Sequence, residues 1–454
     1  MGTPRKPDGR TWLRPILFFL SFSATAHAQS DTAWLFRYPK SEPLAFFADD
    51  TGNVYIAGWS EKGEDRRDVL LLKIDSLGHL AWARTYGRVT ATGATRDGSG
   101  NIYIAGVTNG ARAVGKICML KYRPNGGMGW VKTYAEPGKC FFTLGTIAID
   151  DSQNVYACGA AESSSCYAVR IVKYRPTGEL AGVMRYKLRG YDYLLDGMFH
   201  VLGNGQACIA LSVENDAKFA DWLIAKLSAD SRVPWQRVYE DRGSTWERLV
   251  WSQVDEEANI YLTGEVASAK YGTTVFCTMK MDSLGNIRWI TEHNGPDSLR
   301  GEPYSLVVER GSVYVVGWNM CNKNGQEQAI ALVKYDSLGN ELWARQYGGA
   351  DTMSIPGYFG EEMDVRPSPR LCNMNVDDSG NVYITGTGST SPYSPFAVLL
   401  KYDSQGGLVW ARKRPGAAWN GAIVGLDNKG ALYDIGFGGS AGVGGIYVLK
   451  YRTR

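Results

Sequence analysis

Aromatic and acidic side chains outside the repeating pattern of this chain are its best candidates for recognition chemistry. Some lie directly after or shortly before a short apolar segment that the sequence predicts as a strand, and others lie in segments rich in proline. Tryptophan and tyrosine can bury a large apolar area against a partner while a polar atom stays available. We therefore expect these side chains to bind a protein or a polysaccharide partner. They are Trp59, Trp246, Trp318, Tyr358, Phe359, Glu361, Glu362, Asp364, Tyr393 and Trp419.

Catalytic and metal-binding patterns are weak by comparison. The chain has only 4 histidines, and they are scattered, so a Ser-His-Asp triad or a multi-histidine metal site is difficult to build. No cysteines form a Cys-x-x-Cys pair, which argues against structural zinc. The recurring Asp-x-x-Gly turns are too short for a calcium loop. We expect no catalytic residue, no cofactor and no metal, although the many acids leave carboxylate-pair chemistry open.

A repeat determines where all these residues lie. A lysine precedes a tryptophan by nine residues at several places along the chain. Lys173 keeps the spacing but meets Gly182, Lys450 lies too close to the last residue, and Trp34 has no lysine before it. The complete pairs are Lys73 and Trp82, Lys121 and Trp130, Lys226 and Trp235, Lys280 and Trp289, Lys334 and Trp343, and Lys401 and Trp410.

A second marker has the form Gly-Asn-Val-Tyr-Ile-x-Gly and recurs as often as the lysine. Repeats of this length that are rich in short strands are typical of propeller blades. In the first repeat, strands b and c are apolar at successive positions, which indicates a sheet covered on both faces. Its four predicted strands, lettered a to d in chain order, span residues 44–48, 53–59, 68–74 and 80–86. Copies of the marker span residues 52–58, 100–106, 153–159, 205–212, 258–264, 311–317, 380–386 and 430–436.

The two ends of the chain predict a closed ring. The last repeat stops at Tyr451 after strand c, while residues 32–38 repeat the Trp-Tyr spacing of strand d. We predict an all-β, eight-bladed β-propeller of four-stranded antiparallel blades, closed when the N-terminal strand completes the C-terminal blade and pairs its open edge. The predicted blades span about 41–87, 88–136, 137–190, 191–242, 243–297, 298–349, 350–415, and 416–454 together with 30–39.

The repeated lysines and tryptophans are interpreted as packing residues. A lysine in an apolar strand can bury its stem and extend its ammonium group to the edge of the blade. A tryptophan with the period of the blades can fill the wedge between diverging sheets.

The first 28 residues have the pattern of a secretory signal peptide. A basic segment precedes a short apolar run, and Ala26-His27-Ala28 is a small-x-small cleavage site. We expect residues 29–454 to be a single exported domain that is monomeric, near neutral, without a membrane span and without affinity for nucleic acid. Export permits disulfides, so Cys158 and Cys166 could bridge a hairpin; the alternative is that the cysteines are small buried hydrophobes.

Two segments resemble a known repeat. Residues 377–386 and 399–412 are similar to the SBBP-type bacterial β-propeller repeat, and the likeness covers nearly all of residues 30–454. It implies an exported eight-bladed propeller and no particular activity. Residues 336–343 are distantly similar to the docking motif of quinoprotein dehydrogenases. The alanine, the threonine and the adjacent cysteines typical of those enzymes are missing here, so we do not expect a quinone cofactor.

The loops indicate where a partner would bind. Loops b–c and d–a vary in length and should share one face, whereas the a–b and c–d turns are short and uniform. Variable loops on a rigid scaffold usually carry binding. The segment 350–370 is the largest of them. We expect a non-catalytic binding propeller; the alternatives are a carbohydrate-active or quinoprotein-like enzyme, and a structural or adhesive cell-surface protein.

Overall fold

The protein is described here from a computed structural model of its 454-residue chain. The described residues all belong to one compact unit, Thr32–Arg454. The described residues contain no helix that is long and apolar enough to cross a membrane. The structure describes residues 32–61, 67–108, 115–136, 140–163, 166–215, 218–240, 247–295, 300–320, 328–348, 352–354, 374–389, 395–415, 420–438 and 444–452.

The first four blades follow one another along the chain, each a four-stranded antiparallel sheet. Blade one contains β2 (Ser41–Ala48), β3 (Val54–Glu61), β4 (Arg67–Ile74) and β5 (Leu80–Tyr86). Blade two contains β6 (Val89–Arg96), β7 (Ile102–Thr108), β8 (Ile117–Tyr122) and β9 (Met128–Tyr134). Blade three contains β10 (Cys140–Ile149), β11 (Val155–Ser163), β12 (Cys166–Tyr174) and β13 (Leu180–Lys187). Blade four contains β14 (Tyr193–Val201), β15 (Ala207–Asn215), β16 (Lys218–Leu227) and β17 (Trp235–Tyr239).

The other four blades complete the ring, with one irregular sheet among them. Blade five contains β18 (Glu247–Val254), β19 (Ile260–Ser268), β20 (Thr273–Met281) and β21 (Ile287–His293). Blade six contains β22 (Arg300–Glu309), β23 (Ser312–Met320), β24 (Gln328–Tyr335) and β25 (Glu341–Gly348). Blade seven contains β26 (Thr352–Ser354), β27 (Met374–Val376), β28 (Val382–Ser389), β29 (Pro395–Tyr402) and β30 (Leu408–Pro415). Blade eight contains β31 (Asn420–Leu426), β32 (Leu432–Phe437), β33 (Gly445–Tyr451) and β1 (Thr32–Pro39).

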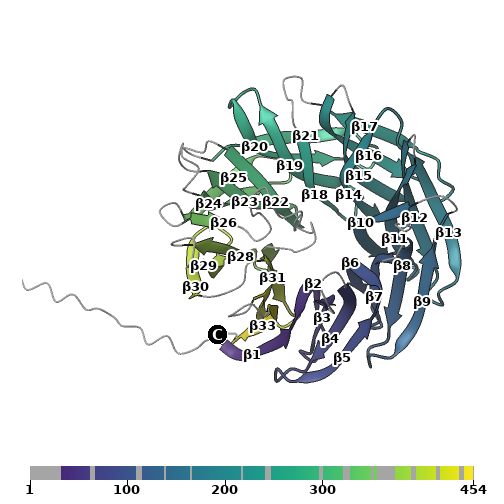
Figure 1. Ribbon diagram of the computed structural model, residues 1–454. Coiled ribbons are helices and arrows are strands. Elements are labelled where there is room, and N and C mark those ends of the chain that lie inside the picture. Colours follow the sequence, from purple (N-terminus) through teal and green to yellow (C-terminus); the bar gives the residue numbers. More distant parts are fainter. Residues whose placement is uncertain are drawn as a thin grey trace, which may run out of the picture. The chain divides into compact units, whose positions relative to one another are not determined.

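The eight-bladed propeller and its closure are confirmed. Strand a of a blade lies nearest the centre of the ring and strand d lies outside, as β2 and β5 show (Figure 1). The N-terminal strand β1 pairs antiparallel with β33 from Thr32 opposite Tyr451 to Pro39 opposite Gly445. Both termini therefore contribute to one blade, and no blade has to end the ring with an open edge.

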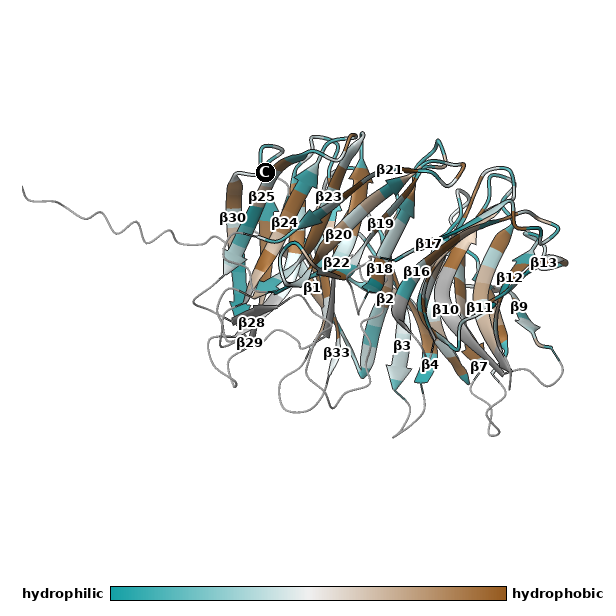
Figure 2. Cartoon of the chain, turned by 90° about the horizontal axis from the view of Figure 1, so that it is seen from above, coloured by the Kyte–Doolittle hydropathy of each residue, from teal (hydrophilic) through white to brown (hydrophobic). Residues whose placement is uncertain are grey.

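Strands b and c are covered on both faces, as the sequence predicts. In blade one, consecutive residues of β3 and β4 are buried, whereas β5 is largely exposed or half-buried. Figure 2 shows hydrophobic residues along strands such as β20 and β24. Each middle strand lies between two neighbouring blades, so apolar residues at successive positions all leave water.

A β-bulge in strand a explains the glycine that ends several of the repeat markers. In blade one, the register shifts opposite Gly58, and a Cβ there would overlap the Glu42 carbonyl oxygen. Gly264 of blade five is blocked in the same way by the Arg248 carbonyl. Glycine is retained because any side chain would collide with the neighbouring backbone. Blade four has Leu211 at this position, and its bulge is displaced along the strand.

The tyrosine of the marker joins the a–b turn to the repeated lysine. In blade two, the Tyr103 hydroxyl donates to Asp97 (3.1 Å), and the Lys121 ammonium lies 5.1 Å from the centre of the Tyr103 ring. Desolvation and the adjacent carboxylate raise the pKa of Tyr103. The lysine stem is thus held inside the blade by a cation–π contact. The same contact joins Lys73 to Tyr55, Lys173 to Tyr156, Lys280 to Tyr261, Lys334 to Tyr314, Lys401 to Tyr383 and Lys450 to Tyr433.

The strand-d tryptophans clamp neighbouring blades together, which confirms their interpretation as packing residues. Trp343 of blade six donates its Nε1 hydrogen to the Ser404 carbonyl in the c–d turn of blade seven (3.3 Å). Its ring lies against Gly406 of that turn, and Arg345 stacks on the ring and donates to the Gly406 carbonyl (2.6 Å). Trp34, Trp130, Trp235 and Trp289 donate to the carbonyls of Ser76, Pro176, Ser283 and Ser337 in the same way.

Blade seven differs from the expected arrangement. We predicted residues 350–370 as a loop between blades, but the sheet contains β26 before residues 355–373 and β27 after them. Ser354 pairs with Thr387 and Met374 pairs with Ile384, so the inserted residues interrupt strand a itself. The interruption lies where the other blades have their bulge. A bulge already breaks the hydrogen-bond ladder, which explains why an insertion is tolerated there.

Of the two alternatives for the cysteines, the strand register excludes a disulfide between Cys158 and Cys166. Both residues lie on the β11–β12 hairpin, but Cys158 pairs with Ile171 while Cys166 pairs with Ser163. Five residue steps along a strand separate these rungs by roughly 16 Å, far beyond the reach of a disulfide. Cys118 and Cys208 fit the alternative, because burial raises the pKa of their thiols to about 11 and about 12.

Candidate functional site

Blades one and six share one arrangement at the ends of their inner strands. In both blades the rung next to the bulge pairs a glutamate of strand a with a tryptophan of strand b. Glu42 lies opposite Trp59, and Glu302 lies opposite Trp318. This end of the sheet carries the d–a and b–c connections, so both Glu–Trp rungs lie on the face that the sequence predicts for binding.

The Glu–Trp rung of blade one is partly open to solvent. Trp59 and Glu42 are half-buried, and the guanidinium of Arg67 lies 5.3 Å from the centre of the Trp59 ring. Burial raises the pKa of Glu42 above its usual value, Arg67 lowers it, and Glu61 raises it. An aromatic ring, a guanidinium and a carboxyl group are therefore presented together. We call Glu42, Trp59 and Arg67 the blade-one cluster.

The Glu–Trp rung of blade six is closed. Glu302 is 3% exposed and Trp318 is 4% exposed. Trp318 donates its Nε1 hydrogen to the Tyr304 hydroxyl (2.9 Å), and Arg300 pairs with Glu302 (2.6 Å). Trp318 packs in the core with Tyr304 and the strands of blades six and seven. The same pairing that blade one exposes is thus part of the interior in blade six.

A second buried carboxylate lies near Glu302. In blade five the equivalent rung pairs Arg248 with Glu265, and their side chains approach to 3.4 Å. Glu265 is also 3% exposed. Burial, followed by the charge of Glu265, raises the pKa of Glu302 to about 7, although Arg300 and Arg248 lower it. The charge of Glu265 thus favours the protonated form of Glu302. We call Glu265 and Glu302 the buried carboxylate pair, which Arg248 and Arg300 accompany.

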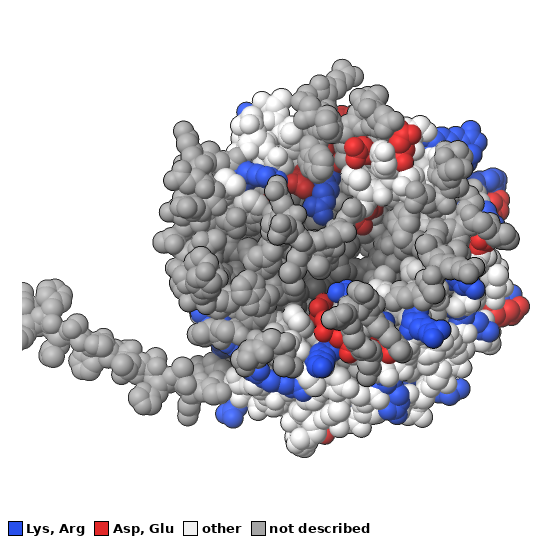
Figure 3. All heavy atoms as spheres, viewed as in Figure 1, with Lys and Arg blue, Asp and Glu red and all other residues white. Residues whose placement is uncertain are grey.

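Charges of both signs also gather on the visible face of the ring. Figure 3 shows acidic and basic side chains next to one another close to its centre. Strands a line this centre (Figure 1), and the blade-one cluster and the carboxylate pair lie on or beside such strands.

Only two of the predicted binding residues fall in the part of the chain that the structure describes. Trp59 and Trp318 each contribute to a Glu–Trp rung, although Trp318 is buried and cannot form an exposed rim as predicted. The predicted sites that lie outside the described residues are Trp246, Tyr358, Phe359, Glu361, Glu362, Asp364, Tyr393 and Trp419.

Sequence analysis did not single out the two glutamates. The signal was present, because among the described strands a only those of blades one and six contain a Glu-Pro pair, Glu42-Pro43 and Glu302-Pro303, and these are the two blades with tryptophan after the marker. Glu265 occupies the position of that tryptophan in blade five. Each glutamate is paired with its tryptophan by the register between strands a and b, which the sequence of a single repeat does not reveal.

The histidines have structural partners. His200 is half-buried and lies 2.7 Å from the Ser252 hydroxyl, and desolvation lowers its pKa to about 4. His293 lies 2.9 Å from Glu341 in the next blade. Among the described residues, no group of three or more His, Cys, Asp or Glu side chains is arranged to hold a metal ion.

Comparison with known proteins identifies the fold and nothing narrower. No protein-family profile and no curated protein matches the chain. The Dos1 propeller is 8% identical, with a TM-score of 0.52 over 91% of this chain and 93% of that one. The WD40 domain of SCAP from fission yeast is 9% identical (TM-score 0.46, 92% and 97% covered). The polysaccharide lyase Uly1 is 10% identical (TM-score 0.45, 90% and 89% covered). At 8% identity, the likeness to the Dos1 propeller shows the fold alone, so the function has to be argued from the site.

Proposed function

We propose that this protein is a non-catalytic binding propeller that holds a protein or polysaccharide partner on its b–c/d–a face. The blade-one cluster is its anchor. The observation that carries the proposal is the repeated Glu–Trp rung, which is buried in blade six but left half-open in blade one. A tryptophan that the fold could bury, and does bury elsewhere, is available to a partner in blade one.

The chemistry of the cluster fits a binding anchor. Tryptophan and arginine are the side chains that most often dominate the energy of an interface. Arg67 covers one side of the Trp59 ring, which pre-orders both side chains and favours a protein partner over a sugar that needs a bare ring face. Glu42 adds an acceptor or, when protonated, a donor.

Export is part of the same proposal. The N-terminal signal pattern supports a partner at the cell envelope or outside the cell. The resemblance to SBBP-type repeats supports this location, since that repeat is typical of exported bacterial proteins.

The test compares variants of residues 29–454 for binding to immobilised envelope proteins and to a glycan array. Trp59→Ala and Arg67→Ala are each expected to weaken binding by at least about tenfold, as for a typical interface anchor. Leu77→Ala is the matched control, because Leu77 is 70% exposed on a c–d turn at the opposite end of the same blade. Replacement of residues 355–373 by a short glycine linker tests the remaining predicted residues of this face.

Two results would contradict the proposal. One is unchanged binding of every detected partner in Trp59→Ala and in the linker variant. The other is equal loss in Leu77→Ala. Trp318→Ala is expected to lower the melting temperature more than the affinity, because that ring is buried.

The buried carboxylate pair favours a second candidate, a carbohydrate-active enzyme. A carboxyl group with a pKa of about 7 can act as a general acid at neutral pH, and a second carboxylate can act as base or nucleophile. Burial of both groups is the argument against it, because a sugar must reach them. New reducing ends released from a polysaccharide by the wild type, and lost in Glu302→Gln and in Glu265→Gln, would favour the enzyme.

A further inference from the structure

The junction between blades three and four has a c–d turn but lacks the tryptophan that packs against this turn at the regular junctions. Gly182 stands where the other complete repeats have the strand-d tryptophan, opposite Lys173. Met184 stands where Arg345 stacks and donates in blade six. In the c–d turn of blade four, Ser231 adopts a positive φ of 69° where other turns have glycine. Three positions that meet at one interface have therefore changed together.

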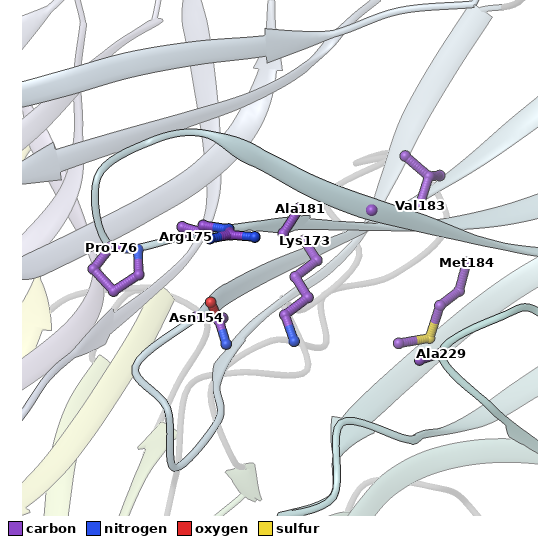
Figure 4. A pocket seen from close by; sticks show the side chains of 9 residues that line it. Asn154, Lys173, Arg175, Pro176, Ala181, Val183, Met184 and Ala229 are labelled. Atoms are coloured by element: carbon purple, nitrogen blue, oxygen red, sulfur yellow. The ribbon is translucent and has the colours of Figure 1, made fainter.

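A pocket lies where the tryptophan is missing. Its volume is about 520 Å³, within the range of about 300 to 1,000 Å³ found for small-molecule sites. A Cβ on Gly182 would meet nothing within 4 Å. In Figure 4 the Lys173 and Met184 side chains point into the opening, with Ala229 of blade four beside Met184. The residues that line the pocket include Asn154, Lys173, Pro176, Gly182, Met184 and Ala229.

The pocket keeps the polar groups that surround an indole at the other junctions. Lys173 still lies over the Tyr156 ring (5.0 Å) and pairs with Asp150 (3.1 Å). Ala229 is the second residue of its turn, the position whose carbonyl receives the tryptophan Nε1 hydrogen in other blades, as at Ser404. A hydrogen-bond acceptor, a lysine stem and a thioether therefore face one space.

Other contacts hold this junction together without a tryptophan. The backbone N–H of Arg185 donates to the Ser231 hydroxyl (3.0 Å), and the Tyr186 hydroxyl donates to Gln236 (2.6 Å). An apolar cluster that includes Leu188, Phe199 and other buried residues also spans blades three and four. The fold consequently does not depend on filling the pocket, which leaves it available to a ligand.

We propose that this pocket binds a planar aromatic ring that carries an N–H or O–H donor, as an indole does. The donor bonds to the Ala229 carbonyl, the ring lies along the Lys173 stem, and the Met184 thioether contacts its edge. Other c–d turns have a glycine, without a Cβ, at the position of Ser231. The Cβ of Ser231 therefore places the bound ring nearer to Met184 than Trp343 lies to Arg345. The site lies among the a–b and c–d turns and is independent of the proposed function on the opposite face.

The test is titration of residues 29–454 with indole, followed by calorimetry and by ligand-observed NMR. Gly182→Trp with Ser231→Gly rebuilds the clamp of the other junctions and should abolish binding. Gly182→Leu fills the same space without a turn change and should do the same if the double variant does not fold. Loss of one hydrogen bond should weaken 1-methylindole about fivefold relative to indole.

The matched control is Trp410→Gly, which removes a strand-d tryptophan at a junction without a covalent c–d turn and should not create a second site for indole. Failure of indole to bind the wild type, or undiminished binding in both filled variants, would overturn the proposal. N-acetyltryptophanamide distinguishes the source of the ring. Binding equal to that of indole indicates a tryptophan side chain of a partner protein, and binding of indole alone indicates a free small molecule.

Discussion

The junction of blades six and seven and the junction of blades three and four solve the same packing problem differently. The first places Trp343 and Arg345 over a glycine turn, and Lys334 donates to the same Ser404 carbonyl as the tryptophan (3.2 Å). The second has Gly182 and Met184 and is linked through the Ser231 hydroxyl. The residue on one blade is therefore matched to the residue on the next. The Trp343 ring packs against a glycine of the c–d turn, whereas the space beside Gly182 allows a serine in that turn. The unit that the repeat preserves is therefore the junction rather than the single blade.

The largest expected effect is at the junction that closes the ring. Removal of residues 29–40 deletes β1, the whole outer strand of blade eight, together with Trp34 and its bond to Ser76 (3.0 Å). Trp34, Phe36 and Tyr38 pack against the buried cluster of blades eight and one. Their loss should cost roughly 5 kcal/mol or more and lower the melting temperature sharply. A melting temperature within a few degrees of the wild type would refute closure by β1.

The next effect tests the regular clamp directly. Trp343→Gly copies the blade-three residue into blade six and should destabilise the protein by about 3–5 kcal/mol, as for other large-to-small changes. Urea unfolding measures it. Trp410→Gly should cost clearly less, because β33 and β1 are not joined by a turn that could receive the ring. Equal costs would mean that the turn contributes nothing to the clamp.

The reverse change at the irregular junction should stabilise the protein modestly. Gly182→Trp with Ser231→Gly fills the pocket and restores the ring-on-glycine contact, for a gain of about 1–2 kcal/mol. Ser231→Gly alone should lower stability, because the Arg185 N–H loses its acceptor. If the double variant is less stable than Ser231→Gly, the pocket does not have the shape of the other clamps.

The smallest expected effect concerns the difference between the two Glu–Trp rungs. The pKa of Glu302 is raised from 4.5 to about 7, so the folded state binds an extra proton between these values. Its stabilising contribution is present below about pH 4.5 and is lost as pH rises through about 7. Glu302→Gln should remove this pH dependence from the melting temperature. Glu309→Gln, on the same strand, is the matched control and should leave the profile unchanged.

Much of the fold could be predicted because its causes are local. The Asp-x-x-Gly turns, the alternation of strands and the constant Lys-to-Trp spacing each follow from backbone geometry within one hairpin. The missed features depend on registers between strands or between blades. Glu42 and Glu302 became candidates only when Trp59 and Trp318 were seen opposite them. Trp318 and Trp59 look equivalent along the chain, yet one is buried, because its surroundings come from other repeats.

The sequence by itself determined that this chain is a closed propeller with eight blades. The strands of a blade can be predicted within each repeat, and the two ends of the chain supply complementary strands of one blade. Only the tertiary structure decided which repeated residues contact a neighbour and which do not. Contacts between blades join residues far apart in the sequence, such as Trp130 and Pro176, which are 46 positions apart. A missing partner therefore appears as a single altered residue in the sequence, but as a pocket once the two blades are brought together.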